Sequence, residues 1–136
     1  MFKKLPLRSK IFNYLCKMKI KGFIIENDQS ILRGGGFANG YVVIPKDHPL
    51  WGLHYTAQEV ESLNVHGGIT FSEKVDEDMI NDPKFGVDLV EEDLGSWVIG
   101  FDTRHFGDTL EKWPRKKVEL EVINLIRQVE KLAVSL

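Results

Sequence analysis

Two short segments of the chain hold the residue types that can do chemistry. The first is His66-Gly67-Gly68, and the second runs from Asp102 to Asp108 with the sequence Asp-Thr-Arg-His-Phe-Gly-Asp. Imidazole and carboxylate groups hold zinc and similar divalent ions at about 2.0–2.2 Å. A guanidinium group pairs with phosphate or carboxylate through two parallel hydrogen bonds. The two segments therefore predict a site for a small anionic ligand or a divalent metal ion.

The glycine pair beside the first histidine allows a ligand or another backbone to approach closely. The predicted ligand-binding residues are His66, Gly67, Gly68, Asp102, Arg104, His105 and Asp108. The predicted metal ligands are His66, Asp102 and His105. Each residue also has an ordinary structural interpretation: a buried histidine bonded to a carbonyl, an aspartate that caps a turn, or an arginine paired with Asp108.

Two predicted strands position these segments. Residues 63–71 are apolar and β-branched and contain His66, whereas residues 97–102 form a strand that ends in Asp102. Rigid strand ends followed by loops are common places for functional side chains. A shared site requires these two strands to be neighbours in the sheet.

The other elements give an α+β fold, a small and mainly antiparallel sheet with a long C-terminal helix packed on one face. Strands are predicted at residues 23–25 and 41–44, a short helix at 10–19, and an acidic surface excursion at 72–95. The last helix begins at Pro114 and has apolar residues at steps of three and four. That apolar stripe comprises Val118, Val122, Leu125, Val129, Leu132 and Leu136.

Length and composition indicate a single globular domain. A chain of 136 residues with 43% hydrophobic residues has enough apolar material for one core. The single Cys16 cannot form an intrachain disulfide, and no apolar run is long enough for a membrane span or a secretory signal. We therefore expect a cytoplasmic protein with a basic N-terminal extension at residues 1–38 and an α+β domain at residues 39–136.

Charge is distributed unevenly along the chain. Residues 1–25 carry seven Lys or Arg and no acid, whereas the remaining residues hold 11 basic and 20 acidic side chains. A basic arm of this kind binds nucleic acid or anionic lipid, or folds back onto its own acidic body. The glycines at 34–36 are followed by no Lys-Ser/Thr pair, which argues against a phosphate-binding P-loop. His48 and His54 lie in a segment typical of turns.

The ordered pattern of motifs resembles a family of small proteins encoded by bacteriophages and prophages. The matching segments are Asn39-Gly40-Tyr41-Val42 with Pro45 and His48-Pro49-Leu50, Val65-His66-Gly67-Gly68-Ile69-Thr70-Phe71, and Trp97 to Asp108. The resemblance covers roughly residues 39–136, up to and including the last helix. It implies a phage accessory protein that acts in the bacterial cytoplasm, and it assigns no catalytic role to any residue.

Three functions are compatible with the sequence, which does not decide whether the protein is an enzyme. The first is capture of a small anionic, nucleotide-like ligand by His66, Arg104 and His105, for example to counter host signalling. The second is a metal-dependent hydrolase of the phosphoester type that uses His66, Asp102 and His105. The third is an interaction protein that acts on a host protein or nucleic acid through its basic arm. The oligomeric state is not indicated.

Overall fold

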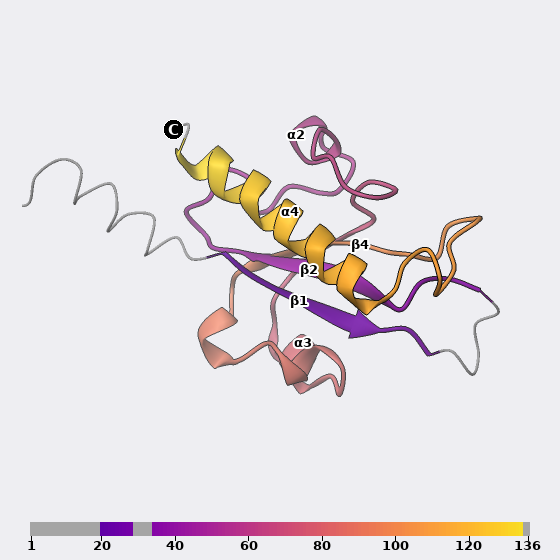
Figure 1. Ribbon diagram of the computed structural model, residues 1–136. Helices are drawn as coiled ribbons and strands as arrows, with labels where there is room; N and C mark the ends of the chain where they lie inside the picture. Colours follow the sequence, from indigo (N-terminus) through magenta and orange to yellow (C-terminus); the bar gives the residue numbers. More distant parts are fainter. Residues whose placement is uncertain (1–19, 29–33, 135–136) are drawn as a thin grey trace, which may run out of the picture.

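The computed structural model describes residues 20–28 and 34–134 (Figure 1). Four strands form one antiparallel sheet in the order β1-β2-β4-β3. The strands are β1 (Lys21–Glu26), β2 (Ala38–Ile44), β3 (Phe71–Lys74) and β4 (Trp97–Phe101). The long helix α4 (Arg115–Val134) packs against this sheet, which confirms the predicted α+β fold and its C-terminal helix.

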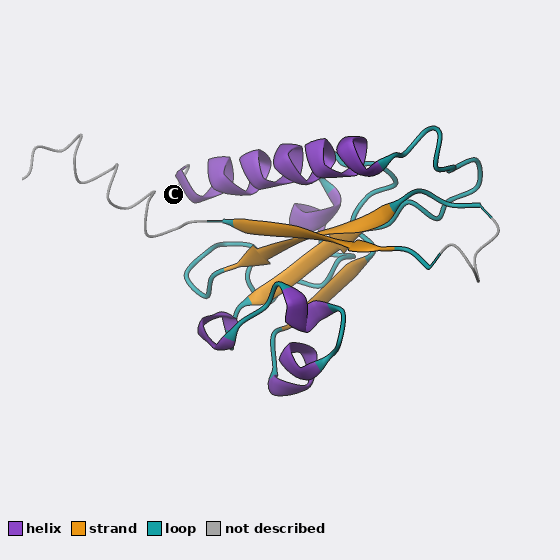
Figure 2. Cartoon of the chain, turned by 60° about the horizontal axis from the view of Figure 1, so that its bottom comes forward, coloured by secondary structure: helices purple, strands orange, loops and turns teal. Residues whose placement is uncertain are grey.

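The central strands are buried on both faces of the sheet. In Figure 2 the helix α4 lies on one side of the sheet, and the short helices of residues 77–93 lie on the other. Two separate apolar clusters result, one under α4 and one on the opposite face. Strands covered on both faces are apolar throughout and do not alternate, which explains the continuous apolar run at 41–44.

The helix α4 presents the predicted apolar stripe to the sheet. Val118, Val122, Leu125 and Val129 are buried, and Leu132 packs against the same cluster. The helix lies close to β1 and β2 because a glycine faces it there: a Cβ on Gly22 would lie 2.6 Å from Val122 Cγ1. Leu136 and the helix predicted at residues 10–19 lie outside the described residues, as does Cys16.

The acidic segment at 72–95 covers the face of the sheet opposite α4. After the end of β3 it contains the helix α3 (Glu77–Asn81) and the 3-10 helices η1 (Phe85–Val87) and η2 (Glu91–Asp93). The acids lie between apolar residues that enter the second cluster, such as Val75, Met79 and Leu89. The prediction of a surface excursion was therefore wrong in part, because this segment forms a layer over the sheet.

The strand predicted at residues 63–71 was wrong over most of its length. Residues 63–70 form turns and loop, and β3 begins only at Phe71. Gly67 and Gly68 have φ values of +69° and +79°, which interrupt extended backbone. The predicted neighbour relationship is nevertheless present, since β3 pairs with β4 and Thr70 N donates to Gly100 O. The loop at 63–70 thus approaches the start of the segment at 102–108.

The first described strand belongs to the sheet, although it falls in the predicted N-terminal extension. All six residues of β1 pair with β2, which itself begins at Ala38. Lys21 Nζ lies 2.7 Å from Asp93 Oδ2, so one basic residue of the predicted arm pairs with the acidic segment. Among residues 20–28 and 34–134, no helix has the length and apolar content needed to cross a bilayer.

Candidate functional site

His66 lies at the corner of a tight turn. Gly68 N donates to Val65 O, and Gly67 occupies the third turn position with a positive φ, as a type II turn requires. The backbone N–H of His66 donates to Glu121 Oε2 of α4 at 2.9 Å. The turn therefore holds His66 in a fixed place beside the helix.

The segment after β4 forms a second turn of the same kind. Asp108 N donates to His105 O, and Gly107 has a φ of +91° at the third position. The backbone carbonyl of Asp108 also accepts a hydrogen bond from Gly35 N. The start of the segment is anchored by the buried Thr103, whose Oγ1 donates to Ala38 O at 2.8 Å.

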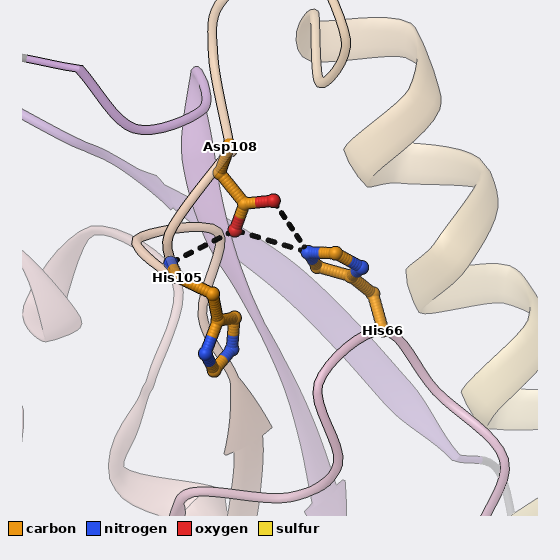
Figure 3. Close-up of side chains that lie close together, drawn as sticks. All are labelled: His66, His105 and Asp108. Carbon is orange, nitrogen blue, oxygen red and sulfur yellow. Dashed lines mark hydrogen bonds and ion pairs between the residues drawn. The ribbon is translucent and has the colours of Figure 1, made fainter.

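The carboxylate of Asp108 joins the two turns (Figure 3). Its oxygens lie 2.9 and 3.0 Å from His66 Nε2, and Oδ2 also accepts from the backbone N–H of His105 at 2.9 Å. Burial by itself would raise the pKa of Asp108, but the hydrogen bonds from His66 and His105 outweigh it and lower that pKa. The ring of Trp113 packs on the His66 imidazole, with centroids 4.1 Å apart.

His105 is placed by close packing. Its imidazole lies directly against Gly67, and its ring centroid is 5.5 Å from that of His66. Nε2 lies 3.2 Å from Asp102 Oδ1, but the two groups are not aligned as a hydrogen bond. This nitrogen is buried, and within the described part of the chain it has no hydrogen-bond partner.

His66, His105 and Asp108 form one potential metal-binding cluster. One ligand atom from each residue can be chosen so that all three atoms lie within 4.8 Å of one another. The cluster contains the two predicted histidines, but its carboxylate is Asp108 where the sequence predicted Asp102. Asp102 lies beside the cluster, and its oxygens accept from Thr70 Oγ1 and from Arg104 N.

Arg104 lies close to the cluster but does not pair with Asp108. It lines a hollow of about 460 Å³ together with His105 and Asp108, and a second hollow with Tyr41 and Lys84. No described residue forms a hydrogen bond or ion pair with its guanidinium group. The predicted Arg104–Asp108 pair is absent, and the Asp108 carboxylate is bonded instead to His66 and to the backbone N–H of His105.

The remaining predicted residues have simpler roles. Gly68 adopts a positive φ, but a Cβ there would meet nothing within 4 Å, so its role is conformational. His48 is buried, accepts from Leu50 N through Nδ1 and donates to Val129 O through Nε2. Trp113 and Glu121, which hold His66, were missed because neither lies in a chemically suggestive segment of the sequence.

Comparison of the chain with models of protein families, with curated proteins and with solved structures finds no match. The resemblance to phage-encoded proteins therefore stays a prediction.

Proposed function

We propose that this protein binds a divalent transition-metal ion between His66, His105 and Asp108 and uses it to hydrolyse a phosphoester. The observation that carries the proposal is the convergence of three ligand atoms, brought within 4.8 Å of one another by two separate turns. Two imidazoles and one carboxylate leave a coordination position open for water, as in catalytic zinc sites. The same ligand set also serves Fe(II).

The surroundings of the ligands favour an ion at this place. Outer groups that fix the orientation of ligating histidines are a regular feature of metal sites. Here Trp113 and Glu121 hold the His66 turn, and Asp102 faces the imidazole of His105. An ion bound through one ring nitrogen of His105 would leave the other nitrogen to donate to Asp102.

The buried Nε2 atom of His105 supports the same proposal. A buried polar atom without a hydrogen bond costs about 1–3 kcal/mol, so each such atom in a native protein calls for a physical explanation. Metal binding changes the hydrogen-bonding needs of the whole ring, because one nitrogen becomes a ligand and the other must donate. With an ion bound at Nδ1, the proton of the His105 ring would lie on Nε2, which would then donate to the Asp102 carboxylate 3.2 Å away.

The hydrolytic step follows from the charge of such an ion. Metal-bound water has a pKa near 7, so it is available as hydroxide at neutral pH. The hydroxide oxygen would form the new bond to phosphorus, the ester P–O bond would break, and the leaving oxygen would take up a proton. Arg104 lines one hollow with His105 and Asp108, and its guanidinium, which no described residue pairs with, would bind the phosphate oxygens there.

Elemental analysis and Co²⁺ absorption test the metal site. We expect one ion per chain in the wild type, and loss of binding in His105→Ala and in Asp108→Asn. Asp102→Asn should weaken binding by about 10–100-fold, as loss of an outer group does. His54→Ala is the matched control, because His54 is exposed and bonds to Thr56 instead. Substoichiometric metal that His105→Ala leaves unchanged would reject the proposal.

The hydrolase activity is tested separately with bis(p-nitrophenyl) phosphate. We expect turnover by the metal-loaded protein, its loss on treatment with a chelator, and its recovery when the ion is restored. A protein that binds the ion tightly but shows no metal-dependent turnover would have a metal site without this activity.

A second candidate function is binding of a small anion without chemistry, for example capture of a host signalling nucleotide. The specific observation in its favour is that Arg104, unpaired within the described residues, shares a hollow with His105 and Asp108. Calorimetry with a nucleotide panel tests it. Binding that persists after metal removal and disappears in Arg104→Ala would favour this function over hydrolysis.

A further inference from the structure

Phe106 lies in the sequence between the proposed metal ligands His105 and Asp108, and its side chain is fully exposed. Its relative exposure is 108%, whereas the next most exposed large hydrophobic residue among those described, Val87, reaches 79%. Burial of a phenylalanine side chain is strongly favourable, and folding gains none of that stabilisation here. A ring left wholly in water beside a cluster of potential ligands is available to contact a bound molecule.

The turn that carries Phe106 is held at both of its ends. Phe106 occupies the second position of the turn that is closed by the Asp108 N to His105 O hydrogen bond. His105 N donates to Asp108 Oδ2, and the Asp108 carbonyl accepts from Gly35 N. The ring is therefore presented by a fixed backbone, which reduces the ordering cost of binding a ligand.

The adjoining hollow has room for a small ligand that carries an aromatic group at one end and an anionic group at the other. Its volume of about 460 Å³ is within the usual range for small-molecule sites. Its lining residues are Gly34, Gly35, Arg104, His105, Phe106, Gly107, Asp108 and Thr109. Phe106, Arg104 and two of the proposed metal ligands, His105 and Asp108, thus border one space.

We propose that this hollow binds a nucleoside phosphate, whose base stacks on Phe106 while its phosphate lies between Arg104 and the His66–His105–Asp108 cluster. The phosphate end rests on the proposed function, whereas the stacking contact is independent of it. Aromatic side chains stack on any base because every base has a flat π face. Among residues 20–28 and 34–134, Arg104 is the only Lys or Arg that lines the hollow. A single nucleotide therefore fits better than a strand of nucleic acid, which requires a basic groove.

The test compares nucleoside 5′-monophosphates with ribose 5-phosphate, which has the same sugar and phosphate but no base. Binding is measured by calorimetry on the full chain, both loaded with Zn²⁺ and after chelation. We expect at least one nucleotide to bind more tightly than ribose 5-phosphate. Phe106→Ala should weaken nucleotide binding by about 5- to 150-fold, the loss of one stacking contact, and leave ribose 5-phosphate unchanged.

Two control variants separate stacking from a general effect on the fold. Phe106→Trp keeps an aromatic ring and should retain nucleotide binding. Val87→Ala removes another exposed apolar side chain and should change nothing. Because Phe106 is exposed, its replacement leaves the core intact.

The outcomes distinguish this inference from the proposed function. A metal ion that binds while Phe106→Ala holds nucleotides as tightly as the wild type would overturn the stacking inference alone. Nucleotide binding that depends on Phe106 in a protein without metal affinity would support stacking and reject the metal site. Equal affinity for every nucleotide and ribose 5-phosphate would also overturn the inference.

Discussion

The imidazole of His105 occupies the space that a side chain at residue 67 would need. A Cβ built on Gly67 would overlap the ring, lying 2.7 Å from Cδ2 and 2.8 Å from Cε1. Real Cβ atoms essentially never come within 3.0 Å of other atoms. Because Gly67 has no side chain, the first turn leaves room for the His105 ring of the second turn. This contact joins the two chemically suggestive segments.

The first prediction compares the two neighbouring glycines. Both have a positive φ, so alanine at either position should cost about 1–2 kcal/mol of unfolding free energy. Only Gly67→Ala should also displace His105 and weaken metal binding, because a Cβ at Gly68 meets nothing within 4 Å. Urea unfolding measures the first effect and a Co²⁺ titration the second. Equal metal affinities in the two variants would show that the His105 contact is unimportant to the site.

The second prediction concerns the pH dependence that His48 confers on stability. Its pKa is lowered from the ordinary 6.5 chiefly by burial, although the bond to the Val129 carbonyl opposes this shift. The unfolded chain therefore takes up a proton more readily than the native protein. As the pH falls below about 6.5, this difference favours unfolding, and stability is lost.

His48→Gln isolates this contribution from those of other titrating groups. The variant should be less stable than the wild type at pH 8, since it replaces a histidine with hydrogen bonds at both nitrogens. The difference in unfolding free energy between the two proteins should shrink between about pH 6.5 and pH 5. A constant difference across that interval would contradict the assignment.

The third prediction removes the charge that joins the two turns. Asp108→Asn keeps the size of the side chain but cannot accept both hydrogen bonds with a full negative charge. We expect a loss of about 1–3 kcal/mol of unfolding free energy at neutral pH. The pKa of Asp108 is lower in the native protein than in the unfolded chain, where it is near the ordinary 3.8. The ionised carboxylate therefore contributes fully to stability above about pH 3.8, and this contribution is lost as the pH falls through the lower native pKa. The free energies of unfolding of wild type and Asp108→Asn should therefore differ at pH 7 and become similar at acidic pH, which urea unfolding at both pH values measures.

The fourth prediction concerns the close approach of α4 to the sheet. Gly22→Ala should destabilise the fold by about 1–3 kcal/mol, because its Cβ would meet Val122 and Ile126 at 2.6 and 2.8 Å. Val122→Ala removes one of these obstacles but leaves a cavity. The double variant should therefore lose less stability than the sum of the two single variants. If the losses of unfolding free energy in the two single variants simply add up in the double variant, contact between a side chain at residue 22 and Val122 is not what destabilises Gly22→Ala.

The main elements were predictable because their signals are local. The apolar spacing of Val118 to Val129 specifies a helix face, and the run at Tyr41–Ile44 specifies a buried strand, without reference to distant residues. The segment at 63–70 was mistaken for a strand because its apolar residues do enter the core, and Val65 and Ile69 are buried from a loop. The spacing of apolar residues indicates which side chains are buried. It does not distinguish an extended strand from a turn whose positive φ values glycine permits.

The sequence by itself determined which two segments hold the candidate side chains: one contains His66 and precedes β3, and the other contains His105 and follows β4. Only the tertiary structure decided that Asp108 and not Asp102 completes the cluster, and that Arg104 borders a hollow with His105 and Asp108 instead of pairing with Asp108. Residue types are local properties, but the direction of a side chain in a loop depends on backbone dihedrals and on partners far along the chain. Here those partners are Gly67, 38 residues before His105, and His66, 42 residues before Asp108.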